Sequence, residues 1–97
     1  MNLSIIIVAH NSARQIEACL SSISPLPASA EIIVLDNGSA DETVELVRSL
    51  ASCRLIVSRT NLGFARAANR AAATATGRHL LFLNPDLRFT DGSPADL

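Results

Sequence analysis

Four short apolar segments, separated by segments with helical periodicity, constrain the fold of this 97-residue chain more than any other feature. They are rich in Ile, Val and Leu, and their apolar residues are mostly consecutive rather than alternating. That pattern is typical of strands covered on both faces. The segments are residues 3–9, 31–35, 54–58 and 79–83. We therefore predict four strands with one helix between each successive pair.

The first two intervening segments carry amphipathic helical spacing. In the first, the residues at i, i+3, i+4 and i+7 are Ile16, Cys19, Leu20 and Ile23. In the second, the apolar face comprises Val44, Val47 and Ala51. The spacing of a capping box precedes each of them, in the pairs Ser12 with Gln15 and Ser39 with Glu42.

The third helix is predicted over residues 64–76, with Gly77 as its C-terminal stop. Its predicted packing face consists of small residues, namely Ala65, Ala68, Ala72 and Ala75. The order β-α-β-α-β-α-β implies right-handed crossovers and a parallel sheet. We predict an α/β fold of the Rossmann-like kind: an open parallel sheet with helices on both faces and the strand order 3-2-1-4.

Three helices leave one face of a four-stranded sheet incompletely covered. We therefore expect residues 1–97 to be part of a larger, truncated domain, whose exposed sheet edge could drive a homodimer. The net charge of −1 argues against a nucleic-acid partner. Cys19 and Cys53 have no metal-ligand spacing and are expected to be reduced thiols. The apolar start lacks a basic leader and is too short to span a bilayer, so a cytoplasmic location is expected.

Polar residues follow every predicted strand, at the edge where ligands bind in open parallel sheets. They are His10 and Asn11, then residues 36–39, then Arg59, Thr60, Asn61 and Gly63, and finally residues 84–86. No G-x-G-x-x-G or P-loop glycine motif is present, so a bound diphosphate would need a metal or arginines. Asp86 at a strand end suits Mg²⁺ or Mn²⁺, which take one or two carboxylates together with substrate phosphates. No nucleophile elbow or Ser-His-Asp order supports acyl chemistry.

Four sequence blocks, in order, resemble the N-terminal, donor-binding half of a family 2 glycosyltransferase of the GT-A fold, nearest to its rhamnosyltransferase-like branch. The blocks are IIVAHNS from residue 6 with CLSSI from residue 19, IVLDNGSAD from residue 33, NLGFARAAN from residue 61 and LFLNPD from residue 81. Together they cover nearly the whole chain.

The resemblance implies a nucleotide-sugar site. Ala9 and His10 would border the base, and Asp36 and Asn37 would approach the base and ribose. Arg66 and Asn69 would face the donor, and Gly63 would permit a close backbone turn. Residues 84–86 stand at the family's D-x-D motif, so Asn84 and Asp86 would lie at the diphosphate and Asp86 would help to hold Mg²⁺ or Mn²⁺.

The implied reaction is transfer of a sugar, with inversion, from a dTDP- or UDP-sugar to a bacterial cell-surface glycan or a lipid-linked acceptor. In this family the catalytic base lies in the C-terminal half, so residues 1–97 are expected to be inactive alone. The full-length protein would be cytoplasmic or peripheral at the inner face of the membrane.

Three departures and two alternatives accompany the resemblance. Asn37 replaces the second acid of the usual Asp-Asp-Gly-Ser block, and Asn84 replaces the first acid of D-x-D. One alternative is a non-catalytic nucleotide-binding module, such as a receiver-like domain, although only His10 and Asn11 follow the first strand, where that domain needs acidic residues. The other alternative is a partner-binding fragment with a decayed site, which the Asn84 substitution favours.

The third departure from the family pattern is the missing C-terminal half.

Overall fold

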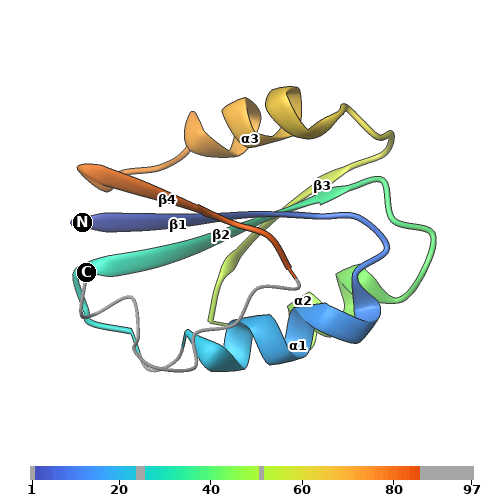
Figure 1. Ribbon diagram of the computed structural model, residues 1–97, viewed down its shortest axis with the longest axis horizontal. Helices are drawn as coiled ribbons and strands as arrows, with labels where there is room; N and C mark the ends of the chain where they lie inside the picture. Colours follow the sequence, from blue (N-terminus) through green and yellow to red (C-terminus); the bar gives the residue numbers. More distant parts are fainter. Residues whose placement is uncertain (1, 24–25, 51, 86–97) are drawn as a thin grey trace.

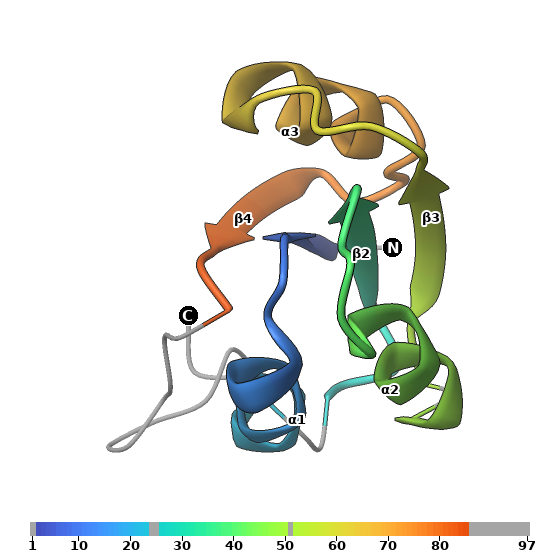
Figure 2. The ribbon, with the colours of Figure 1, turned by 90° about the vertical axis from the view of Figure 1, so that its right-hand side faces the viewer.

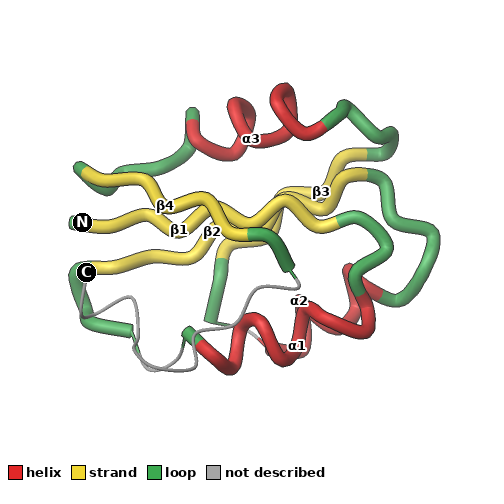
Figure 3. Tube along the Cα trace, viewed as in Figure 1, coloured by secondary structure: helices red, strands yellow, loops and turns green. Residues whose placement is uncertain are grey.

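The computed structural model describes residues 2–23, 26–50 and 52–85. Four strands alternate with three helices, as Figures 1 and 3 show. In chain order they are β1 (Leu3–Ala9), α1 (Ala13–Ser22), β2 (Ala30–Asn37), α2 (Thr43–Leu50), β3 (Arg54–Ser58), α3 (Phe64–Ala72) and β4 (His79–Leu83). The predicted bounds of β1, β3 and β4 are confirmed.

The sheet is parallel throughout and has the order β3-β2-β1-β4. Both the fold class and the strand order predicted from the sequence are therefore confirmed. The register places Ala9 opposite Asp36 and Asn37 opposite Ser58. As a result, the last residues of β1, β2 and β3 end at one edge of the sheet.

Helices cover the two faces of the sheet unequally (Figure 2). On one face, α1 and α2 pack on a cluster that includes Ile5, Ile7, Val34 and Val47. On the other face, α3 alone closes a smaller cluster. Each fully buried Ile contributes about 1.5–3 kcal/mol through apolar burial, so the six fully buried isoleucines among the described residues supply a large part of the stability of the core.

Neither predicted capping box forms. Ser12 is the N-cap of α1, but its hydroxyl bonds to the backbone of His10 instead of to the first turn of the helix. Ser39 lies in the loop after β2, because α2 begins only at Thr43. The strand β2 is also longer than predicted, so that Asp36 and Asn37 are its last two residues and not the first residues of the loop.

The helix α3 is shorter than predicted and buries a different face. It ends at Ala72, and its buried residues are Ala67, Ala68 and Ala71, whereas Ala65 is exposed. Gly77 does not stop the helix. A Cβ there would lie 2.5 Å from the Ser4 Oγ, so the residue must be small to let the chain pass β1.

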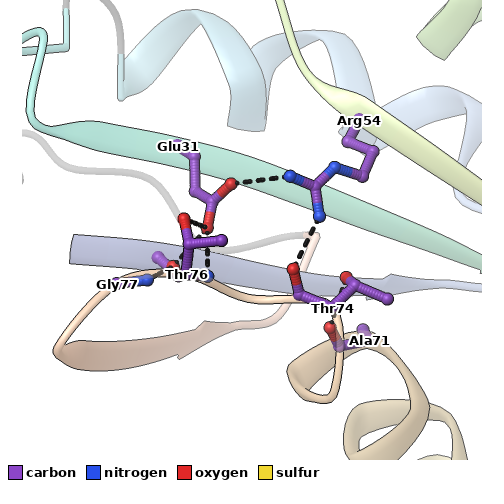
Figure 4. A network of polar contacts seen from close by, with 7 residues as sticks. Glu31, Arg54, Ala71, Thr74, Thr76 and Gly77 are labelled. Atoms are coloured by element: carbon purple, nitrogen blue, oxygen red, sulfur yellow. Dashed lines mark hydrogen bonds and ion pairs between the residues drawn. The ribbon is translucent and has the colours of Figure 1, made fainter. Parts of the chain in front are cut away.

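A polar network joins the N-terminal ends of the strands to the segment after α3 (Figure 4). The Glu31 carboxylate accepts hydrogen bonds from the Ser4 hydroxyl at 2.6 Å and from Thr76, and it pairs with Arg54 at 3.0 Å. The Ser4 hydroxyl bond, followed by the Thr76 backbone bond, holds the pKa of Glu31 below its ordinary value. This network lies at the opposite end of the sheet from the loops that follow β1, β2 and β3.

The edge strand β4 has two large side chains that the helices do not cover. Leu80 and Phe82 are 44% and 45% exposed. They pair in register with Ser4 and Ile6, so they lie on the α3 face, and α3 packs over β1 and β2 instead. This face is incompletely covered, as the sequence predicts. Among the described residues, none of the helices has the length and apolarity needed to cross a bilayer.

Candidate functional site

A continuous set of hydrogen bonds joins the ends of β1 and β2 to the loop before α3. The His10 Nδ1 lies 2.8 Å from the backbone carbonyl oxygen of Asn37. The Asn37 side chain in turn bonds to residues 61–63. Three segments that are far apart in the sequence therefore form one rigid edge, and candidate donor-binding residues lie on each of them.

The Asn37 side chain is committed to this frame. It is 3% exposed, and its Oδ1 accepts the Leu62 N–H at 2.7 Å. Its Nδ2 donates to the Asn61 Oδ1 at 3.1 Å and to the Gly63 carbonyl at 3.4 Å. Both ends of the amide are used and the backbone carbonyl oxygen faces the His10 Nδ1, so Asn37 holds the surrounding loops together. The predicted role of Asn37 at the base and ribose stays a prediction.

Asp36 is also buried, at 1% exposure. Its two carboxylate oxygens accept the Ser39 N–H at 3.1 Å and the Ser39 hydroxyl at 2.5 Å. These bonds close the turn after β2. At 1% exposure the carboxylate is shielded from solvent, and the predicted role of Asp36 at the base and ribose stays a prediction.

The remaining predicted site residues differ in burial and in backbone conformation. Ala9 is fully buried, so its predicted place beside the base stays a prediction. Gly63 has a φ of 79° and precedes α3, a conformation that favours glycine, and a Cβ there would meet open space. Arg66 and Asn69 are exposed and lie three residues apart on α3, hence on the same side of it.

A polar pocket of about 210 Å³ opens beside the end of β1. Its lining residues are His10, Asn11, Ser12, Gln15, Asn84 and Pro85. His10 and Asn84 were predicted as site residues, and the pocket brings them together. Gln15 was expected to cap α1 and instead lines the pocket. Among the described residues, the lining has neither a carboxylate nor a guanidinium, and its amide, hydroxyl and imidazole groups can form hydrogen bonds with a ligand.

The predicted metal ligand Asp86 lies outside the described residues. Among those that the structure describes, no group of three or more His, Cys, Asp or Glu side chains could hold a metal ion. The metal-binding role of Asp86 stays a prediction.

Sequence reasoning missed Asp41. Its carboxylate accepts the N–H of Ala13 at 3.2 Å and that of Thr43 at 3.0 Å, so one side chain serves the first turns of both α1 and α2. The Thr43 hydroxyl bond is the largest of the causes that hold the pKa of Asp41 below its ordinary value. The signal was an Asp two residues before the first residue of α2, in place of the expected Ser39 cap.

Comparison with known proteins assigns the family. The family model described as glycosyl transferase family 2 matches residues 4–97. The chain therefore belongs to glycosyltransferase family 2, and its parallel sheet has the GT-A, Rossmann-like architecture.

Two relatives and one solved structure illustrate the similarity. A PGL/p-HBAD biosynthesis glycosyltransferase of Mycobacterium tuberculosis is 41% identical over 88 residues, which cover 86% of this chain. The Escherichia coli UDP-Glc:alpha-D-GlcNAc-diphosphoundecaprenol beta-1,3-glucosyltransferase WfaP is 36% identical over 87 residues, or 87% of this chain. Glucosyl-3-phosphoglycerate synthase of M. tuberculosis, solved with Mn²⁺, UDP and glucosyl-3-phosphoglycerate, superposes with a TM-score of 0.72 at 31% identity and covers 87% of this chain.

The chain spans only part of these proteins. It matches 34% and 35% of the two relatives and 33% of the solved chain. The similarity therefore covers about one third of the length of each of these proteins.

Proposed function

We propose that residues 1–97 form the donor-binding part of a glycosyltransferase domain that uses a nucleoside diphosphate sugar, with UDP or dTDP as the nucleotide. The base and ribose would lie against His10, the backbone of Ala9, Asp36 and Asn37. The diphosphate and sugar would extend past Gly63 toward Arg66, Asn69 and Asn84.

One observation carries this proposal: the hydrogen-bonded edge in which His10, Asn37 and the loop before α3 hold one another. The edge lies beyond the carboxyl ends of parallel strands, where open α/β sheets bind ligands. The superposition on a chain solved with UDP supports a nucleotide as the ligand. The WfaP name supports a UDP-sugar donor in a relative.

A divalent cation, Mg²⁺ or Mn²⁺, is proposed as the cofactor, with Asp86 as its ligand from this chain. Bound there, a cation would neutralise the charge that develops on the leaving diphosphate. Support comes from the solved chain that contains Mn²⁺ together with UDP. Arg66, on the exposed side of α3, would add a positive charge from this chain itself.

The rest of the reaction belongs to the whole protein. We propose transfer with inversion to a cell-surface glycan or a lipid-linked acceptor, with the general base outside residues 1–97, so that these residues alone bind the donor weakly at most and do not transfer the sugar. Three further proposals come from the sequence: the rhamnosyltransferase-like branch, a homodimer through an exposed sheet edge, and a cytoplasmic or inner-membrane-peripheral location. The diphosphoundecaprenol acceptor in the WfaP name supports a lipid-linked acceptor.

Calorimetric titration of UDP and dTDP into the 97-residue chain, with and without Mn²⁺, tests the proposal. We expect saturable binding that requires Mn²⁺ and that is lost in Asp86→Ala. Asp91→Ala is the control, since it removes the same charge outside the D-x-D position and should leave the binding unchanged. Metal-independent binding, or equal losses in the two variants, would remove the cation role of Asp86. No binding by the folded chain would favour a partner-binding fragment.

A further inference from the structure

Two residues that the donor-site assignment does not use connect the loop after β1 to the loop after β2. The Asn11 N–H donates to the Ser39 hydroxyl oxygen at 2.8 Å, and the Asn11 Oδ1 accepts the Ala40 N–H at 2.8 Å. One residue thus holds the opposite loop through both its backbone and its side chain. These bonds span 28 and 29 positions of sequence.

The backbone of Asn11 adopts an uncommon conformation to make these bonds. Its φ is 47°, and among the described residues it is the non-glycine residue with a positive φ. Asn tolerates this left-handed region better than most residues, at a cost of about 1 kcal/mol. A strained residue that persists in a fold is held by its surroundings, and such residues cluster at functional sites.

The Ser39 hydroxyl relays the connection to Asp36. It accepts from the Asn11 N–H and donates to the Asp36 Oδ1 at 2.5 Å, so the carboxylate is oriented by a residue of the neighbouring loop. The turn between them is itself compact. A Cβ on Gly38 would lie 2.9 Å from the backbone nitrogen of Asn61.

Asn11 also reaches His10. The His10 Nδ1 faces the carbonyl oxygen of Asn37, which can only accept, so Nδ1 carries a proton. In the neutral ring Nε2 is then the acceptor, and the Asn11 Nδ2 lies 3.4 Å from it. Asn11 is therefore connected to both candidate base-contacting residues, to His10 directly and to Asp36 through Ser39.

We propose that Asn11 and Ser39 are positioning residues of the donor site, which hold His10 and Asp36 in one fixed relation so that the nucleoside of the donor meets a preorganised surface. This inference rests on the proposed function. Preorganisation raises affinity because the loops are already ordered before the donor binds, so binding does not include the entropic cost of ordering them. The pair acts by holding His10 and Asp36 in place, and Asn11 also lines the polar pocket beside the end of β1.

The chain contains a matched control for Ser39. The Ser4 hydroxyl also accepts one backbone N–H, that of Gly77 at 2.8 Å, and donates to one carboxylate, that of Glu31 at 2.6 Å. It does so at the opposite end of the sheet. Ser39→Ala and Ser4→Ala therefore remove the same two kinds of hydrogen bond, one near the site and one far from it.

The test measures UDP affinity in the presence of Mn²⁺ together with thermal unfolding for each variant. We expect Ser39→Ala to weaken UDP binding about tenfold, which corresponds to the free energy of roughly one hydrogen bond. Ser4→Ala should weaken UDP binding less than about twofold, although the two variants should lose a similar amount of stability. Ser39→Thr keeps the hydroxyl and should restore affinity. Asn11→Gly keeps the backbone conformation, loses the side-chain bonds and should weaken binding even if Ser39→Ala fails to fold.

The outcomes separate the two claims. Binding by the unmodified chain with equal losses in Ser39→Ala and Ser4→Ala, or unchanged binding in Asn11→Gly, overturns the positioning role and leaves donor binding intact. Absence of UDP binding by the unmodified chain refutes the proposed function, and the positioning role with it. Weakened binding by Ser39→Ala, together with an affinity of Ser39→Thr near that of the unmodified chain, supports the inference.

Discussion

Replacing Asn37 by aspartate exchanges an amide donor for a carboxylate at the centre of the loop frame. In the native chain the Asn37 Nδ2 donates to the Asn61 Oδ1 and the Gly63 carbonyl. In Asn37→Asp both of these acceptors would face another acceptor. Turning the Asn61 amide would supply a donor, but the Gly63 N–H would then lose the Asn61 Oδ1 that it now bonds at 2.8 Å.

The cost follows from burial and from the lost donor. The side chain is 3% exposed, so the new carboxylate cannot regain water, and we expect a loss of about 1–3 kcal/mol in the free energy of unfolding near neutral pH. Burial among acceptors raises the pKa of the new carboxyl group above the ordinary value of about 3.9. Between these two pKa values the folded state binds more protons than the unfolded state, so the stability of the variant falls as pH rises.

Urea unfolding of Asn37→Asp and of the unmodified chain, at about pH 7 and about pH 4, measures both effects. Asn69→Asp is the control because it makes the same chemical change at an exposed position of α3. We expect the deficit of Asn37→Asp to shrink in acid and that of Asn69→Asp to stay small. A variant as stable as the unmodified chain at neutral pH, or a deficit that grows in acid, would refute the reasoning.

Three further predictions concern other parts of the fold. Gly38→Ala should cost more stability than Gly63→Ala in thermal unfolding: both have positive φ, but only at Gly38 would a Cβ lie 2.9 Å from backbone atoms, and such overpacking costs about 1–3 kcal/mol. Glu31→Gln should lower stability at neutral pH, and the difference should vanish as pH falls through the lowered pKa of Glu31; acid titration of both proteins checks this. The double variant Leu80→Ser, Phe82→Ser should reduce any concentration-dependent association seen by analytical ultracentrifugation, and unchanged association would exclude that face as a contact.

The strands could be predicted because their signal is strong and local. The consecutive Ile, Val and Leu residues in β1 and in the buried part of β2 are typical of parallel strands that are covered on both faces. The β-α alternation then restricts the topology of the sheet. The same reasoning stopped β2 at Leu35 because Asp36 and Asn37 are polar. Both are nevertheless buried in the last positions of the strand, where hydrogen bonds from the loops satisfy them.

The helix faces and the loop network could not be predicted in the same way. In α3, alanine occupies several adjacent positions, so periodicity does not distinguish the Ala67 and Ala71 face from the one that includes Ala65. The loop contacts connect residues 24 to 31 positions apart, such as Asn37 with Asn61 and Ser12 with Thr43, and depend on where the strands end. The sequence shows which residues can form such hydrogen bonds, but it does not show which of them lie within hydrogen-bonding distance in the fold.

The location of the donor site is tested most directly by amide NMR shifts of the 97-residue chain during titration with UDP and Mn²⁺. The account predicts saturable shifts concentrated at His10, Asp36, Gly63 and Arg66, with little change around Glu31 and Thr76 at the far end of the sheet. Shifts centred on the Glu31 network, or none in a chain shown to be folded, would contradict it.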